Sequence, residues 1–408
     1  MILMEKALEE IDFLVGNKFD IVDLLNQRSF DVFSDVSLSF LSDISKQLLN
    51  STFVREYPDV ATFAFYCREA NLKVLRMRYY AEIKLQIGRG ILFHIAPGNV
   101  PVNFAYSLLA GLLTGNINIV RVPSKNFEQI SIIVNAINKV LTFEKYKSFF
   151  SNRLYVVKYN RESNATAFFS KICDIRIIWG GDQTIDEIRK FPISSKSTEV
   201  TFSDRYSIAI INANFYLKIP DKSKIASDFY NDTFLFDQNA CTSPQTIYWI
   251  GSMEDVKLAQ DVFWKNLHLV LDEKKYQLQP ISSVDKLTML YSQSISLGDI
   301  ELEPQTSNLI WRIKNSSIHE DIDLYKCNCG YFNEVVISSL IEITPVISRK
   351  YQTIAYLGFK KDELEIWIKN NRPLGVDRIV PIGRTMDFSL IWDGYDLVNI
   401  LSRRVVIT

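Results

Sequence analysis

The sequence has no excess of charge of either sign. Its 408 residues contain 46 lysines and arginines against 47 aspartates and glutamates, which leaves a formal net charge of -1. Proteins that bind nucleic acid or an anionic membrane surface through charge carry a basic excess or a basic patch. The balance therefore gives no support for either partner. A small molecule or another protein is the expected partner.

A secretory signal and a membrane span are also missing from the sequence. Residues 1–10 carry acidic residues early and lack the basic, apolar and small-residue regions of a signal peptide. Residues 90–120 contain no Lys, Arg, Asp or Glu, but prolines and asparagines at 97–103 interrupt them. The longest clean helix that fits there, residues 102–114, is too short to cross a bilayer. We interpret this segment as buried core and predict no membrane span.

The five cysteines are too few and too irregularly spaced for a disulfide framework. An odd number scattered through a long chain indicates free thiols in a reducing compartment, so we expect a cytoplasmic protein. Cys67 and Cys173 fall in apolar patterns and are interpreted as core residues. Cys327 and Cys329 with His319 lack the spacing of a zinc site, and no metal site is predicted.

Histidine is also scarce, with three in the whole chain. His94 lies within an apolar run that reads as a strand, and His268 lies on a predicted helix. Both positions favour a packing role over general acid or base chemistry.

From residue 90 onward, short apolar runs alternate with amphipathic helices. Strands are predicted at 91–95, 117–122, 154–159 and 175–179, and helices at 102–114, 126–141, 164–171 and 184–190. Repeated βα units of this kind form a parallel sheet that is covered on both faces. Such sheets bind nucleotides at the carboxyl ends of their strands. The loops at 96–101, 123–125 and 180–183 are therefore the expected binding edge.

A glycine-rich dinucleotide fingerprint is absent from this predicted sheet. Gly88 and Gly90 begin like one, but they precede their strand instead of following it, and the third glycine is missing. If the sheet binds a dinucleotide, it does so without the usual glycine-rich turn.

The remaining patterns complete a prediction of two domains. Residues 1–86 have helical spacing, most clearly at 11–25 and 60–77, and a second set of strands begins at 206–211. Further elements are predicted at 246–250 (strand), 255–271 (helix), 334–337 (strand), 397–402 (helix) and 404–408 (strand).

We expect residues 1–204 and 373–408 to form one domain and residues 205–372 to form the other. The terminal strand at 404–408 is so short that it needs an existing sheet edge to pair with. A neighbouring subunit can supply such an edge, and a homo-oligomer is expected.

Residues 236–245, Phe-Asp-Gln-Asn-Ala-Cys-Thr-Ser-Pro-Gln, hold the thiol that we expect to carry the chemistry. A small residue precedes Cys241, and a Thr-Ser-Pro turn and an apolar strand follow it. This pattern places the thiol on an accessible loop. Cysteine is the strongest side-chain nucleophile near neutral pH, because its thiolate is partly populated and intrinsically reactive. Cys241 is the candidate nucleophile.

Several other segments stand in a distinctive order along the chain. They read Ile-Ala-Pro-Gly-Asn-Val-Pro at 95–101, Gly-Asn at 115–116, Arg-Val-Pro-Ser at 121–124, Ile-Trp-Gly-Gly-Asp at 178–182 and Trp-Asp-Gly at 392–394. Together with the cysteine segment, they resemble the aldehyde dehydrogenase superfamily. Within it they resemble the acyl-thioester reductases typified by the fatty acid reductase of luminous bacteria. The resemblance covers about residues 88–408.

The resemblance implies an α/β fold of the aldehyde dehydrogenase type. In that fold a Rossmann-type cofactor domain stands opposite an α/β catalytic domain, whose cysteine faces the nicotinamide. By position, Asn99 would be the amide of the oxyanion hole. The residues implied to contact the cofactor are Ile95, Pro97, Gly98, Arg121, Pro123, Ser124, Gly180, Gly181 and Asp182.

Two of these positions bear on the cofactor's identity. A basic residue at Arg121, near the adenosine ribose, would favour the 2'-phosphate of NADPH, with NADH as the alternative. Asp182 departs from the superfamily pattern, because its charge opposes a phosphate at a helix N-terminus. We therefore expect Asp182 to cap the helix.

A second departure concerns water. The hydrolytic dehydrogenases of the superfamily activate water with the glutamate of a Glu-Leu-Gly-Gly-Lys segment. The matching stretch at 201–205 reads Thr-Phe-Ser-Asp-Arg, so this glutamate is missing, although a shift in register would bring in Glu199. An acyl-enzyme that waits for hydride should not be hydrolysed. The departure favours thioester reduction over aldehyde oxidation.

We therefore expect Cys241 to take a long-chain acyl group from an acyl-CoA or acyl-protein thioester and to release it as an aldehyde after hydride transfer from NADPH. The resemblance also implies a protein partner that activates or transfers the acyl group. Alternatives on the same fold are reduction of a small acyl-CoA or acyl phosphate and ordinary aldehyde oxidation. An alternative of another class is a cofactor-free acyltransferase or acyl-relay subunit.

Overall fold

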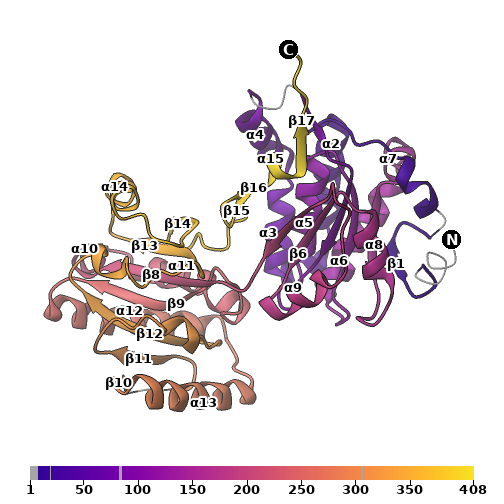
Figure 1. Ribbon diagram of the computed structural model, residues 1–408. Coiled ribbons are helices and arrows are strands. Elements are labelled where there is room, and N and C mark those ends of the chain that lie inside the picture. Colours follow the sequence, from indigo (N-terminus) through magenta and orange to yellow (C-terminus); the bar gives the residue numbers. More distant parts are fainter. Residues whose placement is uncertain (1–7, 19, 82–84, 305–306) are drawn as a thin grey trace. The chain divides into compact units, whose positions relative to one another are not determined.

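The computed structural model describes residues 8–18, 20–81, 85–304 and 307–408, and it divides into two compact units (Figure 1). Unit 1 comprises Met1–Ser203 and Tyr395–Thr408, and unit 2 comprises Asp204–Gly394. The sequence assigned residues 373–394 to the first domain. They belong to unit 2, because strand β14 (Arg378–Pro381) pairs in parallel with β13 (Tyr351–Leu357) of that unit.

Unit 1 is built on a six-stranded sheet in the order β1-β5-β4-β3-β6-β7. Its central strands are the predicted ones, they run parallel and they are almost entirely buried. This burial on both faces matches their near-continuous apolar sequences. The strands are β1 (Asp12–Val15), β3 (Ile91–Ile95), β4 (Ile117–Arg121), β5 (Leu154–Lys158), β6 (Ile175–Trp179) and β7 (Thr198–Phe202).

The helices that follow these strands also match the prediction to within two residues at each end. The helices of unit 1 that belong to or flank the βα units are α5 (Asn103–Leu113), α6 (Glu128–Leu141), α7 (Glu144–Phe150), α8 (Ala165–Ile172) and α9 (Asp182–Arg189). Helix α5 ends as its sequence predicts. Gly115 takes a left-handed φ of 77°, and an added Cβ would lie 2.1 Å from the carbonyl oxygen of Phe30, so only glycine fits this helix stop.

The N-terminal prediction is partly wrong. Residues 12–15 form strand β1, antiparallel to β5, where a helix was expected from 11 to 25. Pairing with an existing sheet edge outweighs the helical spacing, and Gly16, with a φ of 79° and closely packed against Tyr155, ends the strand. The helices here are η1 (Asp20–Asn26), α2 (Asp35–Leu49), η2 (Thr52–Glu56), α3 (Pro58–Tyr66) and α4 (Glu69–Tyr79).

The chain ends in unit 1 with β16 (Tyr395–Asp396), α15 (Leu397–Leu401) and β17 (Ser402–Arg404). Strand β17 pairs antiparallel with β2 (Gln86–Gly88) of the same chain. The terminal strand therefore lies slightly earlier than predicted, and its pairing needs no second subunit.

Unit 2 holds a seven-stranded sheet in the order β10-β11-β12-β9-β8-β13-β14, which is parallel except for β10. The remaining strands of this sheet are β8 (Tyr206–Asn212), β9 (Pro244–Ile250), β10 (Ile300–Leu302), β11 (Trp311–Asn315) and β12 (Tyr331–Ile337), whereas β15 (Ile391–Trp392) belongs to a separate two-stranded sheet. Its helices are α10 (Ala213–Lys218), α11 (Lys222–Asp232), η3 (Phe234–Phe236), α12 (Met253–Glu273), α13 (Pro280–Leu297), η4 (Ile322–Tyr325), η5 (Leu340–Ile343) and α14 (Lys361–Asn371).

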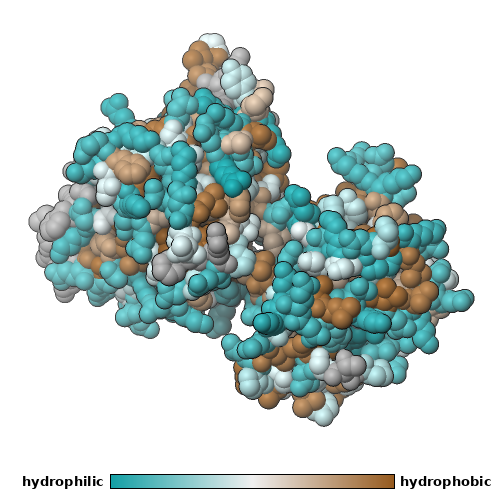
Figure 2. Space-filling model, turned by 180° about the vertical axis from the view of Figure 1, so that it is seen from behind, coloured by the Kyte–Doolittle hydropathy of each residue, from teal (hydrophilic) through white to brown (hydrophobic). Residues whose placement is uncertain are grey.

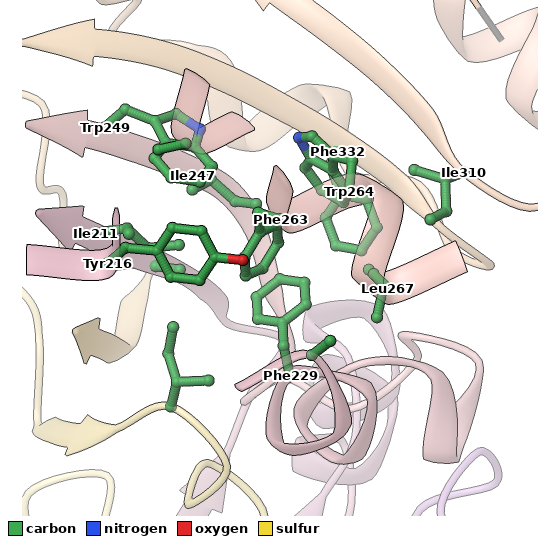
Figure 3. Close-up of a cluster of buried hydrophobic side chains, with 14 of the residues drawn as sticks. Ile211, Tyr216, Phe229, Ile247, Trp249, Phe263, Trp264, Leu267, Ile310 and Phe332 are labelled. Carbon is green, nitrogen blue, oxygen red and sulfur yellow. The ribbon is translucent and has the colours of Figure 1, made fainter. Parts of the chain in front are cut away.

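An aromatic core joins the sheet of unit 2 to α11 and α12 (Figure 3). The Phe229 ring meets the Phe263 ring edge-on at 5.1 Å, and the Trp264 and Phe332 rings also lie 5.1 Å apart. The buried Glu334 carboxylate accepts the indole N–H of Trp264 at 2.9 Å and pairs with Arg312 at 2.8 Å. This core supports β9 and β12, the two strands next to the predicted thiol loop.

Candidate active site

The Cys241 thiol lies on the loop between η3 and β9, as the sequence predicts. Asp237 and Gln238 take left-handed φ values of 51° and 60°, which turn the chain sharply before the cysteine. The buried Gln238 side chain donates to the carbonyl oxygens of Pro244 (2.9 Å) and Tyr331 (3.2 Å) and accepts the N–H of Gly330 (2.9 Å) and Tyr331 (3.2 Å). One amide thus uses all of its hydrogen-bonding capacity to fasten the loop to β12.

Further contacts hold the chain at Cys241 and at the residue after it. The carbonyl oxygen of Cys241 accepts the Ser207 hydroxyl at 2.6 Å, and the Thr242 hydroxyl contacts the Met386 sulfur at 3.3 Å. These contacts come from β8 and from the segment after β14. The thiol is therefore presented by a loop that several strands of unit 2 immobilise.

A carboxylate and an ammonium group stand beside the thiol. The half-buried Cys241 Sγ lies 3.6 Å from Asp204 Oδ1, and Lys326 Nζ lies 2.8 Å from the same oxygen. Lys326 also donates to the carbonyl oxygen of Arg205 at 3.3 Å. Thiol, carboxylate and ammonium thus form one connected set.

The protonation of the thiol follows from this environment. Burial raises the pKa of Cys241, Lys326 and a backbone hydrogen bond at Arg205 lower it, and the charges of Asp204 and Asp393 raise it further. The net direction is upward, so the resting group is a thiol that donates to Asp204. The Asp204 carboxylate is thus the group that accepts the thiol's hydrogen bond, with the Lys326 charge beside it.

Sequence reasoning missed Asp204 and Lys326. It read the stretch 201–205 only as lacking the water-activating glutamate, and the structure places the Asp204 carboxylate of this stretch beside the thiol. Glu199, the other residue considered for the role, pairs with Arg176 at 2.5 Å and Arg189 at 2.8 Å within unit 1. Asp204 was visible in the segment before β8, but Lys326 lies on a distant loop and carries no sequence signal.

The residues predicted to hold the cofactor lie in unit 1, where β4, β3 and β6 are neighbours in the sheet. The loops after these strands meet at one edge, because all three strands are parallel. Strand β3 has β4 as its neighbour on one side and β6 on the other, so the strand order changes direction at β3. Open α/β sheets bind ligands at such a topological switch point. The structure brings to this edge Ile95, Pro97, Gly98, Arg121, Pro123, Ser124, Gly180, Gly181 and Asp182.

This edge has the features that a dinucleotide needs. The Arg121 Nε is buried and has no hydrogen-bond partner among the described residues, while its guanidinium lies 4.9 Å from the centre of the Tyr159 ring. A Cβ added at Gly98 or Gly181 would meet no atom within 4 Å, so both glycines leave open space beside the strands. Another nitrogen of the Arg121 guanidinium donates to the Tyr159 carbonyl oxygen at 3.4 Å. Open space beside a cationic side chain is compatible with a phosphate-bearing ligand.

Asp182 is placed differently from the expectation. It is the first residue of α9, and Gly181 is the N-cap without a side-chain cap hydrogen bond. The carboxylate therefore lies in the first helical turn, where its negative charge interacts favourably with the positive end of the helix dipole, and it is not the cap.

Asn99 lies on the loop after β3 and is exposed.

His94 is a packing residue, as the sequence predicts. It is completely buried on β3; its Nδ1 lies 2.7 Å from the Ser107 hydroxyl and its Nε2 lies 3.1 Å from Asn118 Oδ1. The Trp179 indole N–H donates to the same Ser107 oxygen at 3.0 Å. This network joins β3, β4, β6 and α5 below the predicted cofactor edge.

Acidification is expected to loosen this network. Burial lowers the pKa of His94 from 6.5 to about 4, so between these values the unfolded chain binds a proton that the folded chain does not. The resulting stability is fully present above pH 6.5 and is lost as the pH falls toward 4, with a size on the order of 3 kcal/mol. Urea unfolding across this window measures it. His94→Gln should flatten the slope, and an unchanged slope would contradict the assignment.

The other sequence expectations concern thiols, metals and membranes. Cys67 and Cys173 are buried as predicted, and all five cysteines are free. Within the described ranges, no group of three or more His, Cys, Asp or Glu is placed to hold a metal ion, and no helix is long and apolar enough to cross a membrane. Figure 2 shows one face of the protein, on which hydrophilic residues predominate and hydrophobic ones form separate patches.

The model of the family described as acyl-CoA reductase (LuxC) matches residues 72–404 of this chain. Similar curated proteins are long-chain acyl-protein thioester reductases. Those of Vibrio harveyi and Aliivibrio fischeri are each 25% identical, over 72% and 48% of this chain and over 59% and 36% of their own lengths. A second reductase of Photobacterium leiognathi is 28% identical over 43% of this chain and 35% of its own length. The chain thus matches well under two thirds of each of these relatives.

Solved structures with a similar fold are aldehyde dehydrogenases. Lactaldehyde dehydrogenase from Escherichia coli aligns with a TM-score of 0.61 at 10% identity, over 100% of this chain and 91% of that chain. A glyceraldehyde-3-phosphate dehydrogenase from Methanocaldococcus jannaschii complexed with NADP has a TM-score of 0.60 at 10% identity, over 98% and 92%. The predicted aldehyde dehydrogenase fold is confirmed.

Proposed function

Because the chain belongs to the acyl-CoA reductase (LuxC) family, we propose that it reduces a fatty acyl thioester to an aldehyde through an acyl group carried on Cys241. One observation carries the proposal: the Cys241 thiol lies 3.6 Å from the Asp204 carboxylate, which Lys326 contacts at 2.8 Å. A nucleophile, a proton acceptor and a cation are thereby assembled on an immobilised loop.

Residues of unit 2 account for the proton transfers and the nucleophilic attack of acyl loading. The Cys241 proton passes to Asp204, and the sulfur attacks the thioester carbonyl. The new S–C bond forms as the carbon–sulfur bond of the donor breaks, and the proton on Asp204 passes to the departing donor sulfur. Lys326 lies where it lowers the energy of the thiolate. No redox change occurs in this half, so acyl loading needs no cofactor.

A nicotinamide cofactor would supply the hydride that converts the acyl group to the aldehyde and restores Cys241. We propose that Arg121 and Ser124 meet its ribose and that Gly180 and Gly181 lie beside its pyrophosphate. A cationic guanidinium at the adenosine ribose favours the 2'-phosphate, and hence NADPH over NADH. The NADP complex of the fold relative and the NAD-bound Thermus 1-pyrroline-5-carboxylate dehydrogenase, with a TM-score of 0.60, support the cofactor class.

We further propose a long-chain acyl group on CoA or on a protein, since the curated relatives are long-chain acyl-protein thioester reductases. A partner that activates or transfers the acyl group and a homo-oligomeric assembly belong to the same proposal. The five free thiols support a cytoplasmic setting.

Intact-mass measurement tests the proposal directly. The protein is incubated with acyl-CoA thioesters of increasing chain length, and NADPH is added afterwards. A mass increase equal to the acyl group, followed by its loss with matching NADPH consumption and aldehyde release, is expected. Loss of the acyl group without NADPH consumption would indicate an acyltransferase or hydrolase and would overturn the proposal.

Replacement of Asn99 by alanine is expected to slow acyl loading roughly a hundredfold, since one donor to the oxyanion is removed. Asn99 is exposed on its loop, so the fold should tolerate the change. The rate of the mass increase measures the effect. Asn126→Ala, at another exposed position of unit 1, is the control, and equal rates for the two variants would remove Asn99 from the mechanism.

A further inference from the structure

A cavity of about 710 Å³ opens in unit 2 on one side of the thiol loop. One wall is the face of α13 that carries Ser282, Asp285 and Ser292, spaced at three and seven residues, and the opposite wall includes Asn239 and Lys326. We call this the α13 cavity. Apart from Lys326, its lining residues take no part in the set of groups around the thiol.

The α13 cavity adjoins the reactive sulfur through two short connections. Asn239 precedes Cys241 by two residues, and it accepts a hydrogen bond from Asn328 at 2.6 Å across the cavity wall. Lys326 Nζ contacts the Asp204 oxygen that lies 3.6 Å from the sulfur. The cavity therefore borders the loop that carries Cys241 and the lysine that contacts the thiol's carboxylate neighbour, although Cys241 itself does not line it.

The lining is polar, and its charged residues are Asp237, Asp285 and Lys326. Side-chain amides and hydroxyls predominate, and in the part of the chain that the structure describes no partner hydrogen-bonds the side chains of Gln277, Ser282 or Ser292. Lys326 is the only basic lining residue, and Asp204 already pairs with it. The cavity thus offers donors and acceptors for amides, while its two carboxylates and its already paired lysine disfavour a phosphate.

A fatty acyl chain does not fit this chemistry. Apart from the Tyr276 ring, whose hydroxyl donates to Asp237 at 2.7 Å, the less polar lining side chains are those of Met289, Cys327 and Cys329. Burial of a long chain needs a continuous apolar surface, because each methylene contributes about 0.8 kcal/mol only when it leaves water for apolar contact. The acyl chain must lie elsewhere.

We propose that the α13 cavity binds the amide-bearing thiol arm of the acyl donor and delivers its thioester to Cys241. The arm is a chain of secondary amides that ends in a thiol, as in pantetheine or in a cysteinyl peptide. Amide N–H and C=O groups pair with the cavity's side-chain amides and hydroxyls, and the absence of free cations leaves any nucleotide end outside. This inference rests on the proposed function and adds the site where the donor is recognised.

The test compares donors that share one acyl group and differ in the arm. They are the thioesters of pantetheine, of N-acetylcysteine methylamide and of ethanethiol, which has no amide. Ser292→Trp and Ser282→Trp each place an indole in the cavity, whereas Ser294→Trp changes an exposed position of α13 outside the lining. Acyl loading of the full chain is followed by intact mass, and circular dichroism confirms that each variant is folded.

The cavity variants are expected to lose about tenfold or more in kcat/KM for an amide-bearing donor, and less than about twofold for the ethanethiol thioester and in the Ser294→Trp control. A loss confined to pantetheine identifies that source, and a loss confined to the cysteinyl donor identifies a peptide. Equal changes for all donors, or none, would overturn the inference. Wild-type protein that takes no acyl group from any donor would instead defeat the proposed function.

Discussion

Replacing Cys241 by serine is expected to abolish acyl loading and to slow aldehyde formation by on the order of a thousandfold or more. A serine hydroxyl is far less acidic than a thiol, and the group beside it is a carboxylate that already pairs with Lys326 at 2.8 Å. Oxygen and sulfur differ little in size, and the loop is held mainly by Gln238 and by backbone contacts. The variant should therefore fold normally and still bind its cofactor.

Intact mass with and without acyl-CoA measures this effect, and cofactor binding followed by fluorescence reports on the integrity of unit 1. Cys67→Ala is the matched control, because Cys67 is a fully buried free thiol that lies in unit 1. It should load as much acyl group as the wild type. Stable acyl loading of Cys241→Ser at the wild-type rate would show that another residue is the nucleophile.

The sequence predicted those features that are determined within one short segment of the chain. The strands from β3 to β6 follow from continuous apolar runs, and the thiol loop follows from a turn that enters a strand. Both patterns lie within about ten residues, so no knowledge of tertiary contacts is needed. The cofactor edge follows from the same strands, because parallel neighbours end at one side of a sheet.

The parts that the sequence missed depend on residues far apart in the chain. Asp204 looks like an ordinary charged residue before a strand until Lys326 and Cys241 are brought beside it. Residues 12–15 become a strand only because β5 offers an edge. The α13 cavity likewise depends on the distance between a helix and a loop, which periodicity does not encode.

The strongest test of the proposed chemistry is the opposite action of Asp204 and Lys326 on one thiol. The Asp204 charge raises the pKa of Cys241 and the Lys326 charge lowers it. Asp204→Asn should therefore lower the thiol pKa, and Lys326→Met should raise it. Alkylation of Cys241 by iodoacetamide as a function of pH measures these shifts without any acyl substrate.

Acyl loading separates an electrostatic role of Asp204 from proton transfer. If Asp204 receives the thiol proton, Asp204→Asn slows acyl loading by roughly two to three orders of magnitude even though its thiol is more acidic. If Asp204 only perturbs the thiol, the same variant loads faster at neutral pH, and the proposed transfer is wrong. Lys326→Met should slow loading about tenfold per unit of pKa increase and recover at higher pH. The activation free energy of acyl loading in the double variant should rise by less than the sum of the rises in the two single variants, because both residues act on the same sulfur.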